Sequence, residues 1–351
     1  MEDWHKSIEQ EFGSDVFLSG FSGDVVPTGS CIVDALTGIG GFPIGGIVEV
    51  CGTEGSGKTT LALTSMVSAL RSGKSVMWLD FERKLSSTYA KKLGVNFDLV
   101  RDYVLSPESM EDGWMMINRF CEAPQHRGGM IFVDSVAAMP PISDLEKVKL
   151  IIGQVRVASM AQVMSVAFRQ MINVLKKSQV GIVFLNQERS LIDTTGRSIG
   201  QKTTPGGAAL KFYSSLRLKM EIKGAIKEPQ IDPISGVVAE IVTGLNIQVT
   251  VLKNTLAPSY RKAWVVLRMD EGIDNLTSAV KIAENLGWIK KKGSYYVLAD
   301  RFSGSDTLGG HKEHGFERLR KFFLNNSDVM GILMKDVNDY LTSKPIKSME
   351  E

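Results

Sequence analysis

The chain has 351 residues, 43% of them hydrophobic and 23% charged, which excludes a disordered, collagen-like or coiled-coil protein. Its 41 basic and 39 acidic side chains leave a net charge of +2, so any contact with a nucleic acid must come from local groups. Three scattered cysteines, with no signal peptide or long apolar run, predict a cytoplasmic protein without membrane contact.

The first three-fifths of the chain predict a parallel sheet. A short helix is expected at Glu2–Phe12, and from residue 46 to residue 184 short apolar runs alternate with longer amphipathic stretches. The predicted strands are Ile47–Cys51, Ser75–Leu79, Asp102–Leu105, Met130–Val133 and Gly181–Leu185. The predicted helices between them are Lys58–Arg71, Ser86–Leu93, Ser109–Cys121 and Val157–Lys177. A sheet covered by helices on both faces binds ligands at the carboxyl ends of its strands.

The pattern changes after residue 187. Residues 188–204 are polar and contain glycine, so they predict a long loop that is functional or mobile. Alternating apolar residues then predict antiparallel strands at Leu216–Ile222, Ile247–Leu252 and Ala263–Arg268. The remainder predicts a small α+β unit, with a helix, a hairpin and two further helices at Asn275–Leu286, Trp288–Leu298, His314–Asn325 and Val329–Leu341.

A phosphate-binding motif follows the first predicted strand. Residues 52–59 read Gly-Thr-Glu-Gly-Ser-Gly-Lys-Thr and fit the P-loop pattern G-x-x-x-x-G-K-[S/T] between a strand and a helix. The glycines let backbone N–H groups surround an anion, and the helix directs its positive end toward it. We expect Lys58 to reach the β- and γ-phosphates of a nucleotide and the Thr59 hydroxyl to coordinate Mg²⁺.

Carboxylates follow two other strands. Asp134, after Met130–Val133, is expected to hold Mg²⁺ through water, although an Asp-Ser pair also suits a helix N-cap. Asp80 and Glu82 follow the second strand and point the same way, so one can cap locally while the other faces the nucleotide. Glu82 lies further out and is the better candidate to orient or deprotonate the attacking water.

Through these motifs, the sequence resembles the bacterial RecA recombinase family, in a compact form that would suit a phage or mobile element. The pair Asp134–Ala138 and Gly206–Tyr213 is close to family-specific. The resemblance implies an α/β fold: a RecA-like P-loop ATPase core at residues 28–270, with a twisted, mostly parallel sheet and helices on both faces. It also implies an N-terminal polymerisation helix and linker at 1–27 and a small C-terminal α+β domain at 271–351.

The resemblance also implies roles for individual residues. Glu82 is the general base, Tyr89 stacks on adenine, Gln187 senses the γ-phosphate, and Lys253 acts on the neighbouring subunit's nucleotide. The catalytic set is thus Glu82, Lys58, Gln187 and Lys253. ATP and Mg²⁺ are the implied cofactors, with Thr59 and Asp134 at the metal. The implied nucleotide-binding residues are Gly52, Thr53, Glu54, Gly55, Ser56, Gly57, Lys58, Thr59, Thr60, Tyr89 and Asp134.

Two segments correspond to the family's DNA-binding loops, residues 147–155 and 188–204. Loop amides and a few cations can hold phosphates without reading sequence, although a mobile surface connection and a solvated helix charge at Arg169 are the alternatives. The implied DNA-binding residues are Arg156, Arg169, Arg189, Arg197, Lys202, Gly206 and Gly207.

The expected function is that of an ATP-dependent recombinase, which forms filaments on single-stranded DNA and exchanges strands with a homologous duplex. The chain departs from the family pattern at Ser86 and Met269, near the base, and at Thr255, where a second lysine from the neighbouring subunit is expected. A missing cation slows phosphoryl transfer. Two alternatives therefore stay open: an ATP-gated DNA coat with little hydrolysis, and a ring-forming motor such as a helicase.

Overall fold

The computed structural model describes residues 23–96, 103–143, 157–192, 198–205, 207–231, 236, 238–299 and 310–343. The helix predicted at Glu2–Phe12 and the first predicted DNA loop, residues 147–155, lie outside these ranges. No helix within them is both long enough and apolar enough to span a membrane.

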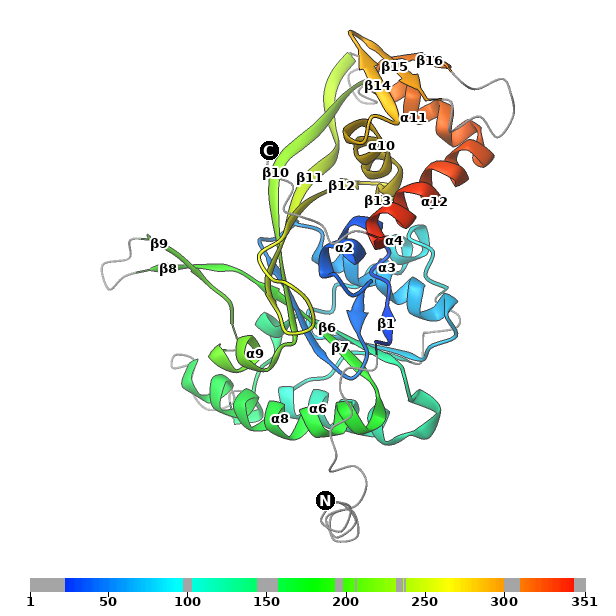
Figure 1. Cartoon of the computed structure of the whole chain (residues 1–351). Coiled ribbons are helices and arrows are strands. Elements are labelled where there is room, and N and C mark those ends of the chain that lie inside the picture. The colour runs from blue at the N-terminus through cyan, green and yellow to red at the C-terminus, as the bar shows by residue number, and fades with distance from the viewer. Residues whose placement is uncertain are drawn as a thin grey trace, which may run out of the picture.

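A nine-stranded sheet runs through the centre of the described chain (Figure 1). Its strands in spatial order are β13 (Gly272–Ile273), β12 (Lys262–Arg268), β11 (Val238–Asn254), β10 (Leu216–Ile231), β3 (Ile47–Gly52), β7 (Gly181–Gln187), β6 (Met130–Asp134), β4 (Val76–Asp80) and β5 (Val104–Leu105). The strands from β10 to β5 are parallel, and those from β10 to β13 are antiparallel. The predicted fold class, a mostly parallel sheet with helices on both faces, is confirmed.

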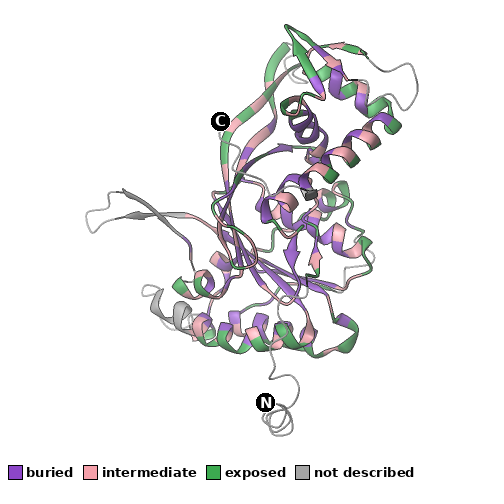
Figure 2. Cartoon of the chain, viewed as in Figure 1, coloured by how far each residue is buried: buried purple, intermediate pink, exposed green. Residues whose placement is uncertain are grey.

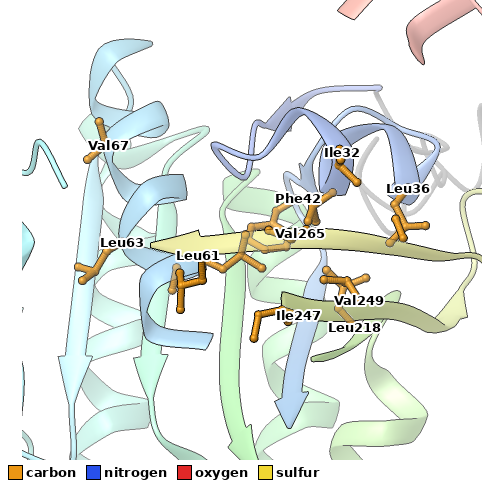
Figure 3. Packing of buried hydrophobic residues seen from close by; sticks show 14 of the residues in the cluster. Ile32, Leu36, Phe42, Leu61, Leu63, Val67, Leu218, Ile247, Val249 and Val265 are labelled. Carbon is orange, nitrogen blue, oxygen red and sulfur yellow. The ribbon is translucent and has the colours of Figure 1, made fainter. Parts of the chain in front are cut away.

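Helices cover both faces because alternate residues of each buried strand point in opposite directions. One apolar cluster joins the strands to α3 (Lys58–Arg71), and a second joins them to α6 (Met110–Glu122) and α8 (Val157–Ser178). The central strands are accordingly buried (Figure 2). Figure 3 shows part of the first cluster, with side chains from α2 (Cys31–Thr37), β2 (Phe42–Pro43), α3 and the antiparallel strands: Ile32, Leu36, Phe42, Leu61, Ile247, Val249 and Val265.

Strands β10 and β11 are longer than predicted. They have 16 and 17 residues and pair from Leu216↔Asn254 to Ile231↔Val238, whereas the sequence predicted only Leu216–Ile222 and Ile247–Leu252. The outer half of β10 carries Lys, Glu and Pro, and that of β11 carries Glu, Thr and Gly. Both are largely exposed, and they lack the apolar alternation on which the prediction depended. This outer ribbon runs along the C-terminal elements (Figure 1).

The predicted loop at residues 188–204 is in part a hairpin. Strand β8 (Arg189–Ile192) pairs with β9 (Ser198–Thr203), and the two project away from the central sheet (Figure 1). The loop prediction was wrong for these residues because backbone pairing needs no apolar side chains. The hairpin leads into α9 (Gly207–Tyr213).

The C-terminal elements are α10 (Asn275–Asn285), β14 (Ile289–Lys292), β15 (Tyr295–Leu298), β16 (Lys312–His314), α11 (Phe316–Asn325) and α12 (Ser327–Ser343). The predicted helices and hairpin are present, and β16 extends the hairpin to three strands. The shorter remaining elements are β1 (Val25–Val26), which pairs with β2, the helix α4 (Ser87–Lys92), and single 3₁₀ turns at Pro124–His126 and Val136–Ala138.

Candidate nucleotide site and DNA-binding hairpin

The P-loop has the compact backbone that its sequence predicts. A Cβ on Gly52 would lie 2.2 Å from the carbonyl oxygen of Met220, and Gly57 has a φ of 85°. The ammonium of Lys58 donates to the carbonyl oxygens of Thr53 (2.7 Å) and Gly52 (3.1 Å) and is almost fully buried, which lowers its pKa. Lys58 thus lies over the loop that is predicted to hold phosphates.

The two predicted metal-site residues lie together. The Thr59 hydroxyl donates to Oδ2 of Asp134 at 3.0 Å, and burial raises the pKa of Asp134 to about 6. A hydroxyl beside a carboxylate fits Mg²⁺, which takes few protein ligands and completes its shell with phosphates and water. The described residues contain no group of three or more His, Cys, Asp or Glu side chains suited to a metal.

Glu82 lies at the same edge of the sheet, and three donors hold its carboxylate. Oε1 accepts from the Ser135 hydroxyl (2.5 Å) and from Nε2 of Gln187 (3.0 Å), and Oε2 lies 3.3 Å from Nζ of Lys84. Burial raises the pKa of Glu82, but the hydrogen bonds from Ser135, Lys84 and Gln187 and the Lys84 charge outweigh it and lower the pKa below its ordinary value. Glu82 is therefore ionised and able to accept a proton.

The structure shows which groups the neighbouring carboxylates contact. Asp80 caps locally, because its carboxylate accepts from the backbone N–H groups of Lys84 (3.4 Å) and Leu85 (2.9 Å). Asp134 and Ser135 do not act as helix caps, since their side chains bond to Thr59 and Glu82 instead.

Tyr89 of α4 lies beside the start of α3, and Ser86 lies at the start of α4. The Tyr89 hydroxyl is 2.8 Å from Oγ1 of Thr60, so the ring lies next to the P-loop helix. Ser86, which departs from the family pattern, is the N-cap of α4 and accepts from the Tyr89 amide at 3.2 Å. Ser86 therefore helps to position Tyr89 by capping the helix that carries it.

Lys253 lies elsewhere in the protomer. Its ammonium donates to the carbonyl oxygens of Phe212 (2.6 Å) and Lys211 (3.2 Å) at the C-terminal end of α9. The amide and the hydroxyl of Thr255 both donate to the carbonyl oxygen of Ser215. The side chain of Met269 is exposed, and its amide donates to the carbonyl oxygen of Thr243. The predicted contact of Lys253 with the nucleotide of a neighbouring subunit stays a prediction.

The predicted DNA-binding residues fall into three groups. Arg189 and Lys202 belong to β8 and β9, where their neighbours across the hairpin are Thr203 and Ser190, and Gly207 begins α9. Arg169 is exposed on α8 and bonds to the Ser165 carbonyl of its own helix. Arg156, Arg197 and Gly206 lie outside the described residues.

Sequence reasoning missed several contacts that organise the site. The donors Ser135 and Lys84 to Glu82 were not predicted, and neither was a buried group formed by Glu49, Asn186 and Arg217. One signal was present: a glutamate in the middle of the apolar strand Ile47–Gly52 must have a partner if that strand is buried.

Comparison with known proteins decides the family. The sequence-family model for the RecA N-terminal domain matches residues 2–274 of the chain. The chain belongs to the RecA family. Relatives of this RecA-family chain include Protein RecA of Thermus aquaticus, which is 36% identical over 327 residues, 92% of this chain and 89% of that protein. Protein RecA of Borrelia hermsii is 33% identical over 96% of this chain and 87% of its own length, and that of Aquifex aeolicus is 33% identical over 95% and 90%.

Among solved structures, the RecA-family chain is similar to the RadB recombinase. The sequences are 19% identical, the TM-score is 0.49, and the match covers 71% of this chain and 98% of the other.

Proposed function

We propose that this RecA-family protein, an ATP-dependent DNA recombinase, forms filaments on single-stranded DNA, pairs it with homologous duplex DNA and exchanges the strands. The observation that carries the proposal is the 3.0 Å hydrogen bond from Gln187 to Glu82. Gln187 ends β7, and the hairpin strand β8 begins two residues later. One side chain thus connects the candidate base for ATP hydrolysis to the candidate DNA-binding element.

The P-loop would hold the nucleotide phosphates. Lys58 would leave its two carbonyl partners and pair with the β- and γ-phosphates. Their negative charge would stabilise the buried ammonium, which has lost most of its contact with water. Thr59 and, through water, Asp134 would hold Mg²⁺, which offsets the phosphate charge. Tyr89 and the other loop residues would position the base and phosphates of ATP.

Glu82 would act as the general base for the attacking water. Oε1 now accepts two hydrogen bonds, one from Ser135 and one from Gln187. When Gln187 turns toward a γ-phosphate, Oε1 loses one donor and can accept a proton from water instead. The same rotation of Gln187 changes the start of the hairpin, so nucleotide state and DNA binding are coupled.

The filament would complete each nucleotide site. Lys253 rests on α9 in the single protomer, and in a filament it would reach the nucleotide of the neighbouring subunit. Residues 1–27 would serve assembly, 28–270 the ATPase, and 271–351 a small closing domain. Arg156, Arg169, Arg189, Arg197, Lys202, Gly206 and Gly207 would contact DNA.

A second function, a DNA coat that hydrolyses little ATP, is favoured by Thr255. Its hydroxyl and amide both bond to Ser215, so this position supplies no cation for the γ-phosphate. Filament assembly and pairing need ATP binding alone, whereas turnover needs the developing charge to be neutralised.

One assay separates these functions. Formation of joint DNA molecules and release of phosphate are followed together, with and without single-stranded DNA. We expect pairing together with DNA-stimulated hydrolysis; pairing without hydrolysis supports the coat, and duplex unwinding with hydrolysis supports a motor.

The variant Glu82→Gln tests the assigned base in the same assay. Glutamine keeps the shape, and its oxygen still accepts from Ser135 and Gln187, while its N–H2 group replaces the oxygen beside the exposed Lys84. It cannot take the proton, so kcat should fall roughly 10²- to 10⁴-fold while ATP and DNA binding persist. Glu122→Gln, at the exposed end of α6, is the matched control and should keep wild-type turnover. Full turnover in Glu82→Gln would remove Glu82 from the mechanism.

A further inference from the structure

A glutamate is buried in the middle of the strand that carries the P-loop. Glu49 of β3 has no exposed surface, and its neighbours along the strand, Val48 and Val50, belong to the apolar cluster under α3. Because side chains alternate along a strand, Glu49 faces the opposite side of the sheet, toward α8 and α9. A buried carboxylate is costly unless each oxygen has a partner.

Both oxygens of Glu49 have partners. Oε2 accepts from Nε of Arg217 on the adjacent strand β10 at 2.5 Å, and Oε1 accepts from Nδ2 of Asn186 on the other adjacent strand, β7, at 2.9 Å. Arg217 stands opposite Glu49 in the parallel register. The carboxylate thus joins three neighbouring strands below the P-loop.

Asn186 connects this carboxylate to both ends of the hairpin. Its Nδ2 donates to Glu49 and also to the carbonyl oxygen of Pro205 at 3.1 Å, and its Oδ1 accepts from the Gln187 amide at 3.0 Å. Both acceptors are oxygens without a proton, so only one orientation of the amide satisfies the contacts. Asn186 precedes β8 and Pro205 follows β9, so one fully buried amide holds the two chain ends of the hairpin together.

We propose that Glu49, Asn186, Arg217 and Pro205 form a hairpin-root clamp that transmits DNA binding by β8 and β9 to the ATPase site. The clamp rests on the proposed function, in which the hairpin binds DNA and Glu82 activates water. Glu49 lies three residues before Gly52 on the P-loop strand, and Asn186 lies one residue before Gln187, the donor to Glu82. Glu49 and Asn186 are positioning residues in this scheme, since neither touches nucleotide.

Stability alone does not account for the arrangement. A buried ion pair is generally no more stabilising than well-packed apolar residues of the same volume. What the charged pair adds is a fixed acceptor for Asn186, and through Asn186 a fixed separation of the two hairpin ends.

Two double variants isolate the decisive hydrogen bond. Arg217→Met with Glu49→Gln removes both charges but keeps an oxygen that accepts from Asn186. Arg217→Met with Glu49→Leu also removes both charges and lacks that acceptor. Neither leaves a buried unpaired charge. The two differ in the acceptor for Asn186 and in the N–H2 group that Gln places where Arg217 stood, and burial of that group makes a retained stimulation ratio in the Gln variant the stricter result.

The readout is the ratio of ATP hydrolysis rates with and without a single-stranded oligo-dT. We expect the Gln variant to keep nearly the wild-type ratio. In the Leu variant the ratio should fall about ten- to hundredfold, which corresponds to the free-energy cost of leaving one buried donor without an acceptor. The DNA-free rate and the KM for ATP should stay unchanged. A merely structural role would lower the DNA-free rate as well.

A third variant keeps the ion pair intact in case the Leu variant does not fold. In Asn186→Ser the hydroxyl donates only one hydrogen bond, so Glu49 and Pro205 are no longer joined, and the stimulation ratio should again fall. Stimulation at the wild-type ratio in the Leu and Ser variants, or equal loss of basal and stimulated rates, overturns the clamp alone. A wild-type protein whose hydrolysis does not respond to single-stranded DNA overturns the proposed function as well, so the two failures are distinguishable.

Discussion

Asp34 shows how one carboxyl makes stability depend on pH. Its Oδ1 accepts from the Thr28 amide at 2.7 Å, and loss of solvent raises its pKa to about 7, despite that bond. Because this pKa is above the unfolded value of 3.8, the folded state binds the proton more tightly. The stabilisation is complete below about pH 4 and is lost as the pH rises through about 7.

The variant Asp34→Asn keeps an oxygen for Thr28 and removes the charge. Between pH 5 and pH 8 the free energy of unfolding of the wild type should fall relative to the variant by about 2–3 kcal/mol. Urea unfolding of both proteins across this range measures the difference. Parallel pH profiles would show that Asp34 does not carry the effect.

At the residue scale, the sequence predicted what lies within a motif and missed what crosses between motifs. Lys58 and Thr59 follow from one local pattern, and Glu82 and Asp134 follow from their places at strand ends. The hydrogen bond between Ser135 and Glu82 joins residues 53 apart, and that between Asn186 and Glu49 joins residues 137 apart. Such pairs depend on strand order, which spacing along the chain does not specify.

At the scale of elements, the electrostatic role proposed for the hairpin of β8 and β9 can be measured. Each phosphate neutralised on a single strand contributes about 0.7 to the slope of log K against log salt. Arg197→Ala with Lys202→Ala should therefore weaken single-strand binding and reduce the slope by about 1.4 per protomer. Titration of a fluorescent oligo-dT at several salt concentrations gives both values.

A matched control removes the same charge elsewhere. Lys321→Ala with Lys335→Ala takes two exposed lysines from α11 and α12 and should leave the slope unchanged. Equal slopes for wild type and hairpin variant would contradict the DNA-binding role of these two residues.

Element boundaries were predictable where packing dictates the pattern. Helix α3 begins and ends where predicted, at Lys58 and Arg71, because the P-loop fixes its start and one face is buried throughout. The hairpin and the outer ribbon of β10 and β11 were not predictable in this way. Their pairing depends on backbone hydrogen bonds, which need no periodic apolar side chains and so leave no periodic apolar signal.

At the scale of the whole molecule, one charge cluster joins the ribbon, the sheet and the C-terminal elements. Asp274, the N-cap of α10, accepts from Nε of Arg268 on β12 (3.2 Å) and Nε of Arg320 on α11 (3.1 Å). Arg268 also pairs with Glu228 of the ribbon and with Glu317 of α11. Asp274 and both arginines are buried, so the carboxylate at the centre has two cations that depend on it.

Replacing this central charge should loosen the C-terminal elements. In Asp274→Asn the side-chain oxygen can still cap α10 through the Thr277 amide, now at 2.8 Å, but the two buried arginines lose their common anion. Breaking a buried pair in this way costs about 3–5 kcal/mol, and the remaining glutamate partners should hold the loss near the lower end. Glu317→Gln, at a half-exposed partner of Arg268, should cost less than about 1 kcal/mol. Urea unfolding followed by limited proteolysis compares the two variants: early cleavage after residue 274 is expected in Asp274→Asn alone, and equal stability of both variants would show that the cluster does not hold these parts together.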